Sequence, residues 1–213
     1  MKKAGILYTL IILFVVASIS VAQDEERWRN FEVLLDVGLT SPSGTLADWK
    51  DSLGAKTGLN FGFSGAYYFR DAFCAGVYFH YTQLGIDSDE DYGMNFKMYD
   101  VGSYFKYNFG GESLWEPYIK ATIGVNSVKF PTWVTPSQRV LREQSYDPGL
   151  SLGGYLGILY YTSEFGGIFL ETGFHQDPLK DTEANYRGEI YTIDDNLAYL
   201  EIKLGIAAFF GPE

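Results

Sequence analysis

Charged residues stand at alternate positions within several apolar segments of this chain. They comprise five carboxylates and three amines: Glu32, Asp36, Asp100, Glu171, Glu201, Lys106, Lys120 and Lys203. Carboxylates and amines that are buried in a protein are normally paired with one another. In a pore, the same residue types set which ions pass. These residues therefore predict either a sealed network of ion pairs or a charged conduit, depending on the elements that hold them.

Acid–base or nucleophilic catalysis has few candidate residues in the sequence. A hydrolytic site needs a hydroxyl nucleophile, a base and an orienting carboxylate. His175 has Asp177 close by and Glu189 further on, but Asp177 stands where a serine would be required. His80 has no serine beside it. With one cysteine and two histidines in total, the sequence predicts no metal site, no cofactor and no enzyme.

Two polar segments have the composition of exposed loops that bind partners. The first, "DSDEDYG", is acidic and contains Asp87, Asp89, Glu90 and Asp91. We expect it to be a solvated loop that bridges lipopolysaccharide through divalent cations. The second, "KFPTWVTPSQRVLREQ", combines Trp133 with Arg139 and Arg142. An exposed aromatic residue flanked by arginines can anchor a ligand, although Trp133 can equally pack on a membrane interface.

Most of the chain alternates between apolar and polar residues with a period of two. In "YLEIKLGIAAFF", Leu200, Ile202 and Leu204 share one parity, while Glu201 and Lys203 share the other. This alternation places one set on each face of a β-strand. It recurs in seven segments, at residues 31–39, 59–69, 73–82, 98–109, 119–126, 168–175 and 199–210. An eighth segment, residues 150–161, is typical of a strand, but its sequence does not distinguish its two faces.

The connections between these eight strands alternate between short and long. The long ones cover residues 40–57, 83–95, 127–148 and 176–195. In an antiparallel meander, all of them lie at one end of the sheet. The strand number, strand length and loop asymmetry predict an all-β fold, an eight-stranded antiparallel up-and-down transmembrane β-barrel. A soluble lipocalin-like barrel is the alternative, with its apolar faces inside.

The first 22 residues predict a secretory signal peptide. Lys2 and Lys3 precede an apolar run, and small residues stand at Ser20 and Ala22. The barrel domain is then predicted over residues 23–213. The net charge of −11 argues against nucleic acid as a partner, because nucleic-acid binding needs basic patches.

This combination of signal peptide, eight alternating strands and an aromatic-ended last strand resembles the small outer-membrane β-barrels of Gram-negative bacteria, the OmpA/OmpX-like group. The resemblance covers essentially the whole mature chain and rests on pattern. It implies an outer-membrane location after Sec export, contact with membrane lipid and lipopolysaccharide, and recognition of Tyr199 to Phe210 by the barrel-assembly machinery. Three residues follow Phe210 here, which departs from the family pattern.

Two functions remain open from the sequence. The first is a structural or surface-interaction role, in which the long extracellular loops bind an extracellular ligand or other surface components. The second is a narrow porin-like diffusion channel for ions or small solutes, in which the charges on the inner face set the ion preference.

Overall fold

A computed structural model describes residues 29–44, 54–70, 72–87, 95–110, 114–135, 140–145, 148–186 and 189–211. Nine β-strands make up almost all of this part of the chain. Their bounds are β1 Phe31–Ser43, β2 Gly54–Arg70, β3 Phe73–Asp87, β4 Phe96–Asn108, β5 Trp115–Thr135, β6 Val140–Ser145, β7 Gly149–Ser163, β8 Gly166–Tyr186 and β9 Glu189–Phe210. Within the described residues, no helix is long and apolar enough to cross a membrane.

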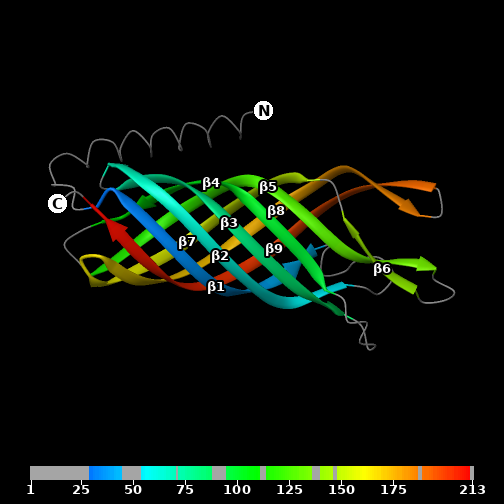
Figure 1. The fold of residues 1–213 in the computed structure, drawn as a ribbon, viewed down its shortest axis with the longest axis horizontal. Coiled ribbons are helices and arrows are strands. Elements are labelled where there is room, and N and C mark those ends of the chain that lie inside the picture. The colour runs from blue at the N-terminus through cyan, green and yellow to red at the C-terminus, as the bar shows by residue number, and fades with distance from the viewer. Residues whose placement is uncertain are drawn as a thin grey trace, which may run out of the picture.

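The strands form one closed antiparallel sheet. The order in the sheet is β4-β3-β2-β1-β9-β8-β7-β5, and pairing of β4 with β5 closes the ring (Figure 1). The short β6 adds no position to the wall, because β6 and β7 pair with successive parts of β5. The barrel therefore has eight wall strands. The fold class predicted from the sequence, an eight-stranded antiparallel up-and-down transmembrane β-barrel, is confirmed.

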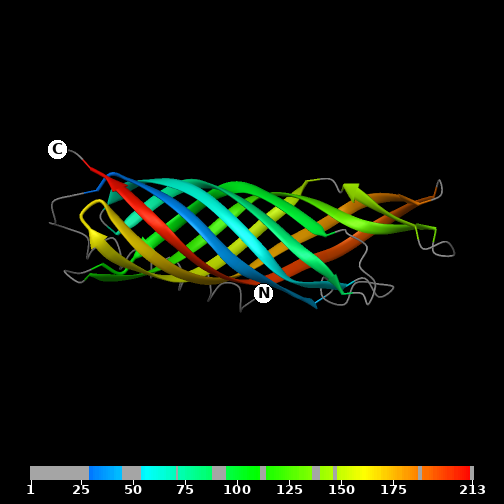
Figure 2. The same cartoon turned by 60° about the horizontal axis from the view of Figure 1, so that its bottom comes forward.

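The strands are strongly inclined to the barrel axis. Following directly paired residues once around the wall from Phe31 leads back to Ser41 of the same strand, a stagger of ten residues (41 − 31 = 10). Such a stagger in eight strands requires a tilt of roughly 35–45°. Figure 2 shows the resulting oblique crossing of front and back strands. An interior of this width has room for side chains only.

Apolar side chains cover the outer face of the barrel. On β9 they run from Leu200 to Phe210 at every second position, and β1 continues the pattern from Phe31 to Leu39. With the strand rise and tilt, such a run covers about 25 Å, which is the height of the apolar band of outer-membrane barrels. The alternate positions of these strands, which carry the charged residues, face the inside of the barrel. The soluble alternative is therefore wrong, because it needs the reverse arrangement.

Aromatic rings gather on the outer face at the end of the barrel that carries the tight turns. Neighbouring rings are in contact there: Phe31 with Tyr67 at 5.1 Å, Phe73 with Tyr107 at 4.7 Å and Trp115 with Tyr160 at 4.5 Å between centroids. Amphipathic aromatic rings favour the membrane–water interface. This girdle therefore marks one boundary of the membrane-spanning part.

Two of the four predicted long loops are largely strands. Residues 127–148 contain the end of β5 and all of β6, and residues 176–195 contain the ends of a hairpin in which β8 pairs with β9 as far as Tyr186 and Glu189. Both hairpins project beyond the barrel at the end opposite the tight turns (Figure 1). The prediction of loops there was wrong because strands outside a membrane need no apolar face, so the alternation disappears.

Glycines on the inner face make room for large side chains from neighbouring strands. A Cβ atom on Gly173 would lie 2.6 Å from Cγ of the Tyr155 ring, and one on Gly102 would lie 2.8 Å from Cε1 of Tyr78. Each ring thus occupies space that a side chain at the glycine would need. On the outer face, by contrast, a Cβ on Gly154 would meet nothing within 4 Å. The glycines inside the barrel are therefore part of its packing.

This difference predicts opposite responses to the same substitution. Gly173→Ala should lower the free energy of unfolding by about 1–3 kcal/mol, because Tyr155 must move. Gly154→Ala, one strand away on the outer face, should change it by less than about 0.5 kcal/mol. Equilibrium urea unfolding in lipid vesicles, followed by tryptophan fluorescence, measures both values. Equal effects of the two variants would contradict this account of the interior.

Candidate functional site

Glu32 organises the lumen near the tight-turn end. Lys106 Nζ donates to its Oε1 at 2.6 Å and also contacts Oε2. The hydroxyl groups of Tyr68 and Tyr104 donate to the same carboxylate at 2.6 and 3.1 Å, and Cys74 Sγ lies 3.7 Å away. Glu32 and Lys106 are both fully buried. One ion pair is thus saturated by hydrogen-bond donors, as burial of charge requires.

A second ion pair closes the barrel at its tight-turn end. Arg29, just before β1, donates to Glu116 at 2.6 Å, and Tyr161 also donates to this carboxylate. The Arg29 guanidinium lies over the Tyr68 ring at 4.4 Å and near the Phe209 ring at 5.4 Å. Both charged side chains are buried. Sequence reasoning missed Arg29, which precedes the alternation, and Glu116, which has inward parity but lies before the predicted start of its strand.

The middle of the lumen holds two lysine–glutamate pairs. Lys120 Nζ lies 2.6 Å from Glu171 Oε2, and Lys203 Nζ lies 2.9 Å from Glu201 Oε2. Glu171 and Lys203 are also direct partners across β8 and β9. Two glutamates and two lysines therefore form one continuous cluster.

Asp36 differs from the other charged groups of the lumen. It is half-buried and lies against the bare backbone of Gly62. Its Oδ1 has no hydrogen-bond partner among the described residues. Asp36 is thus the carboxylate of the lumen that is least constrained by its neighbours.

A buried cluster around His175 lies toward the end of the lumen with the projecting hairpins. His175 Nε2 lies 2.9 Å from Ser151 Oγ, 3.2 Å from Asp100 Oδ2 and 3.1 Å from Asp177 Oδ1. Its Nδ1 lies 3.0 Å from the Tyr155 hydroxyl, which in turn donates to Glu201 at 2.7 Å. This chain of contacts links the cluster to the lysine–glutamate pairs.

This arrangement differs from a catalytic triad. In a triad, one imidazole nitrogen contacts the nucleophile and the other contacts the carboxylate. Here Ser151, Asp100 and Asp177 all meet the same nitrogen of His175. Ser151 and Asp177 are also inaccessible to solvent, which leaves no room for a substrate. Glu189, the third residue of the predicted arrangement, pairs with Tyr186 at the far tip of the β8–β9 hairpin.

Apolar side chains fill the mouth of the lumen above this cluster. Leu84 and Phe96 are direct partners across β3 and β4, and both are fully buried. They belong to a cluster that also contains Ala55, Met98, Val128, Leu197 and Tyr199. This apolar cluster separates the charged groups of the His175 cluster from the solvent at the mouth of the lumen. Within the described residues, buried side chains thus occupy the tight-turn end, the middle and the mouth of the lumen.

The structure places all eight predicted lumen residues on the inner face. Seven are buried and Asp36 is half-buried. It brings six of them together in pairs or clusters: Glu32 with Lys106, Lys120 with Glu171, and Lys203 with Glu201. Asp100 has partners that the sequence analysis did not assign, namely His175, Ser151 and Tyr78. The alternation along its strand is enough to predict that Tyr78 points into the lumen. Which residues Asp100 contacts there depends on the register between strands, which the sequence does not give.

The predicted loop residues fall mostly outside the described part of the chain. Asp89, Glu90, Asp91 and Arg139 lie outside the described residues. Asp87 ends β3, Trp133 lies on β5 opposite Leu141, and Arg142 lies on β6 opposite Thr132. The structure describes the backbone of these three residues and not their side chains.

The two residues of the predicted assembly signal lie on opposite faces. Phe210 ends β9 on the outer surface, directly opposite Phe31 of β1. Tyr199 lies inside the lumen, stacked on His175 with 4.9 Å between ring centroids, and donates to Asp177. Its burial gives Tyr199 a packing role in the folded barrel, and recognition by the assembly machinery stays a prediction.

A closed eight-stranded barrel with an apolar exterior and a packed polar interior is the architecture of small outer-membrane barrels. The comparison with solved structures agrees. Neisserial surface protein A shares the fold with a TM-score of 0.57 and 19% sequence identity, covering 84% of this chain and 97% of that protein. OprG from Pseudomonas aeruginosa has a TM-score of 0.51 and 12% identity, covering 86% and 98% of the two chains. AlkL has a TM-score of 0.52 and 10% identity, covering 89% and 94%.

These likenesses concern the fold, since sequence identity is low throughout. No family model matches the chain. No curated protein matches it either.

The geometry around Glu32 predicts a strong dependence of stability on its partner. Lys106→Met should lower the free energy of unfolding by about 3–5 kcal/mol, because it leaves a buried carboxylate without its counter-charge. The double variant Glu32→Gln/Lys106→Met should recover a large part of this loss, since no charge remains in this pair and the glutamine oxygen still accepts from one of the two tyrosines. Urea unfolding in vesicles tests both variants. A double variant that is less stable than Lys106→Met would refute the pairing.

Proposed function

We propose that this protein is an outer-membrane barrel with a closed lumen, which acts through the structures it presents at the cell surface. Its fold is that of bacterial outer-membrane proteins, which supports an outer-membrane location. Export through a signal peptide over residues 1–22, insertion by the barrel-assembly machinery and contact with lipopolysaccharide belong to the same proposal.

The packed lumen is the observation that carries this proposal. Ion pairs close the tight-turn end and the middle, and apolar side chains fill the mouth. An ion that passed through would have to break a buried pair and cross an apolar layer, both of which are unfavourable. The barrel wall and lumen therefore support a role as a rigid scaffold. A catalytic role gains no support from the His175 cluster, and we propose that the protein is not an enzyme.

The two projecting hairpins are the best candidates for surface interactions. They differ in sequence charge: the β8–β9 hairpin contains Asp181, Glu183 and Asp194, while the β5–β6 segment contains Lys129 and Arg142. Acidic groups favour divalent cations and, through them, the phosphate groups of lipopolysaccharide. Basic and aromatic groups favour an anionic ligand. The name of Neisserial surface protein A is consistent with exposure at the cell surface.

A narrow channel is the second candidate function, and Asp36 is the observation that favours it. The described lumen contains seven carboxylates but four lysine and arginine side chains. Asp36 is half-buried and Oδ1 is unpartnered within that region. An excess of negative charge at this level would attract cations if the lumen opened.

A permeability measurement separates the two functions. Vesicles that contain the folded protein should release trapped potassium, chloride and sugars no faster than vesicles without protein, because the lumen is filled. Folding is checked by the mobility of unheated samples on gels. Permeable vesicles whose cation preference falls in Asp36→Asn would establish the channel and refute the closed scaffold.

Shortening the hairpins should remove surface binding and leave the barrel intact. In one variant an Asn-Gly turn replaces residues 180–194, and in the other it replaces residues 133–141, which keeps the remaining strand pairs in register. Binding of the reconstituted protein to immobilised lipopolysaccharide with Mg²⁺ should fall in the first variant and change little in the second. Unchanged binding in the first variant would exclude the acidic hairpin as the contact.

A further inference from the structure

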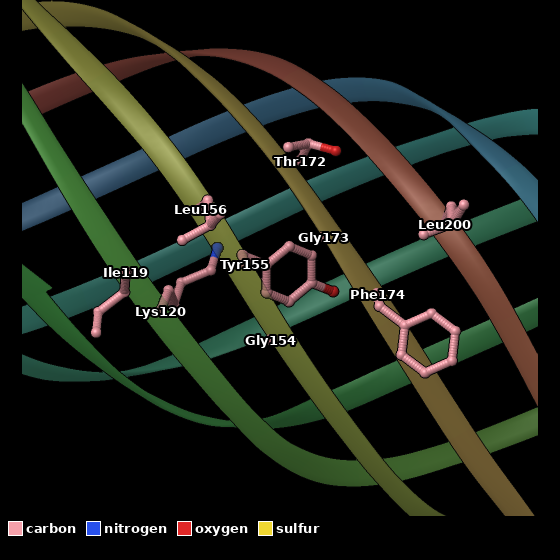
Figure 3. Close-up of a pocket in the computed structure, with 9 residues that line it drawn as sticks. All are labelled: Ile119, Lys120, Gly154, Tyr155, Leu156, Thr172, Gly173, Phe174 and Leu200. Atoms are coloured by element: carbon pink, nitrogen blue, oxygen red, sulfur yellow. The ribbon is translucent and has the colours of Figure 1, made fainter. Parts of the chain in front are cut away.

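An oblique hollow crosses the outer face of the barrel over β5, β7, β8 and β9. It encloses a volume of about 500 Å³ and is open toward the surroundings of the barrel. Figure 3 shows Ile119 on β5, Leu156 on β7, Phe174 on β8 and Leu200 on β9 around the backbone at Gly154. This feature is independent of the lumen and the hairpins on which the proposed function rests.

The hollow exists because Gly154 has no side chain among the larger outer-face residues Leu152, Leu156 and Phe174. Gly154 is the direct partner of Phe174 on one side and of Ala121 on the other. Along β7, Leu152 and Leu156 flank it on the same outer face. A Cβ placed on Gly154 would meet nothing within 4 Å. The space beside the inner-face glycines Gly157 and Gly173 is filled by neighbouring rings, but this outer-face glycine is left open.

The long direction of the hollow runs from the hairpin end toward the middle of the membrane band. Leu200 is the direct partner of Ser41, near the hairpin end of β1, and of Phe174. The next row toward the tight-turn end joins Thr172, Leu156 and Ile119. The hollow therefore extends across two rows of the wall, from the leaflet on the hairpin side inward.

The lining is apolar and its polar groups are satisfied. Leu156 is 63% exposed, and Phe174 and Leu200 are also exposed to the surroundings of the barrel. Thr172 donates its hydroxyl to the Glu201 carbonyl at 3.0 Å. Lys120 and Tyr155 also border the hollow, but their polar ends bond to Glu171 and Glu201 inside the barrel. An apolar occupant therefore fits this surface better than a polar one.

The position and size of the hollow decide among apolar occupants. It lies within the apolar band, so the hydrocarbon of the bilayer is continuous with it. A second protein chain would need a far larger contact, since stable protein interfaces involve about 20–30 residues a side, whereas nine residues line the hollow. A depression lined by apolar side chains from four neighbouring strands offers contacts to a single hydrocarbon chain that lies across them.

We propose that this hollow holds one acyl chain of a bilayer lipid from the leaflet on the hairpin side. The chain lies over Gly154, between Phe174 and Leu200 on one side and Leu156 and Ile119 on the other. The barrel thereby retains one lipid at a defined place, while the lipids around the rest of the band exchange freely.

Native mass spectrometry of the full protein, released from nanodiscs of phosphatidylethanolamine and phosphatidylglycerol, tests this proposal. The wild-type barrel should carry one phospholipid as the main adduct. Gly154→Phe should fill the hollow and lower the fraction of this adduct about tenfold. Gly65→Phe is the matched control, because Gly65 is an outer-face glycine on β2 whose added Cβ would meet only Glu32 O at 3.7 Å.

Each remaining outcome has a definite meaning. Equal adducts in Gly154→Phe, Gly65→Phe and the wild type would overturn the proposal. A protein dimer that is lost in Gly154→Phe would show instead that a second copy occupies the hollow, and would also overturn it.

A second experiment needs no variant that could fail to fold. A phospholipid with a diazirine on its acyl chain is photolysed in vesicles with the wild-type protein, and the labelled residues are mapped. Labelling should be several-fold higher on Leu156, Phe174 and Leu200 than on Val77, Phe79 and Val101, which are exposed apolar residues on β3 and β4. Uniform labelling around the band would refute a defined lipid site.

Discussion

The need to satisfy every backbone hydrogen bond within lipid governs this structure. A sheet in a bilayer cannot leave an open edge, and pairing of β4 with β5 removes the last one. Eight strands with a stagger of ten residues then give a lumen that is only wide enough for side chains. Closure therefore has two consequences: the outer face must be apolar, and the inner face must pack against itself.

Packing of the interior combines two devices. Large rings from one strand lie on glycine backbone of the next, as Tyr155 does on Gly173, which fills the centre without widening the wall. Buried charges are neutralised by partners on strands far apart in sequence, such as Glu32 with Lys106. Tyrosine rings and a polar network thus fill the interior together, as Tyr155 does with Glu201, and both require that the strands keep one register.

Particular residues show how far the sequence predicts this structure. The alternation in β9 predicts its two faces correctly, because lipid on one side and a polar lumen on the other impose opposite residue types on alternate positions. In β7 the prediction fails to separate the faces, since glycines occur on both: Gly153 is inside and Gly154 outside. The partners in the His175 cluster were also unpredictable. Ser151 is 24 residues from His175, and they meet only through the pairing of β7 with β8.

The charges of the lumen offer an explanation for why an apolar interior was not used. In a strand, a slip of one residue exchanges the two faces completely. With apolar residues on both faces, such a slip in β1 or β9 would be tolerated, because either face suits lipid. With Glu32, Glu201 and Lys203 on one face, the same slip would expose charges to hydrocarbon at a cost of several kcal/mol. A buried ion pair adds little net stability compared with apolar packing, but it penalises every wrong register. The inner charges therefore disfavour a one-residue slip, and this penalty is an explanation of the charged lining that needs no transported ion.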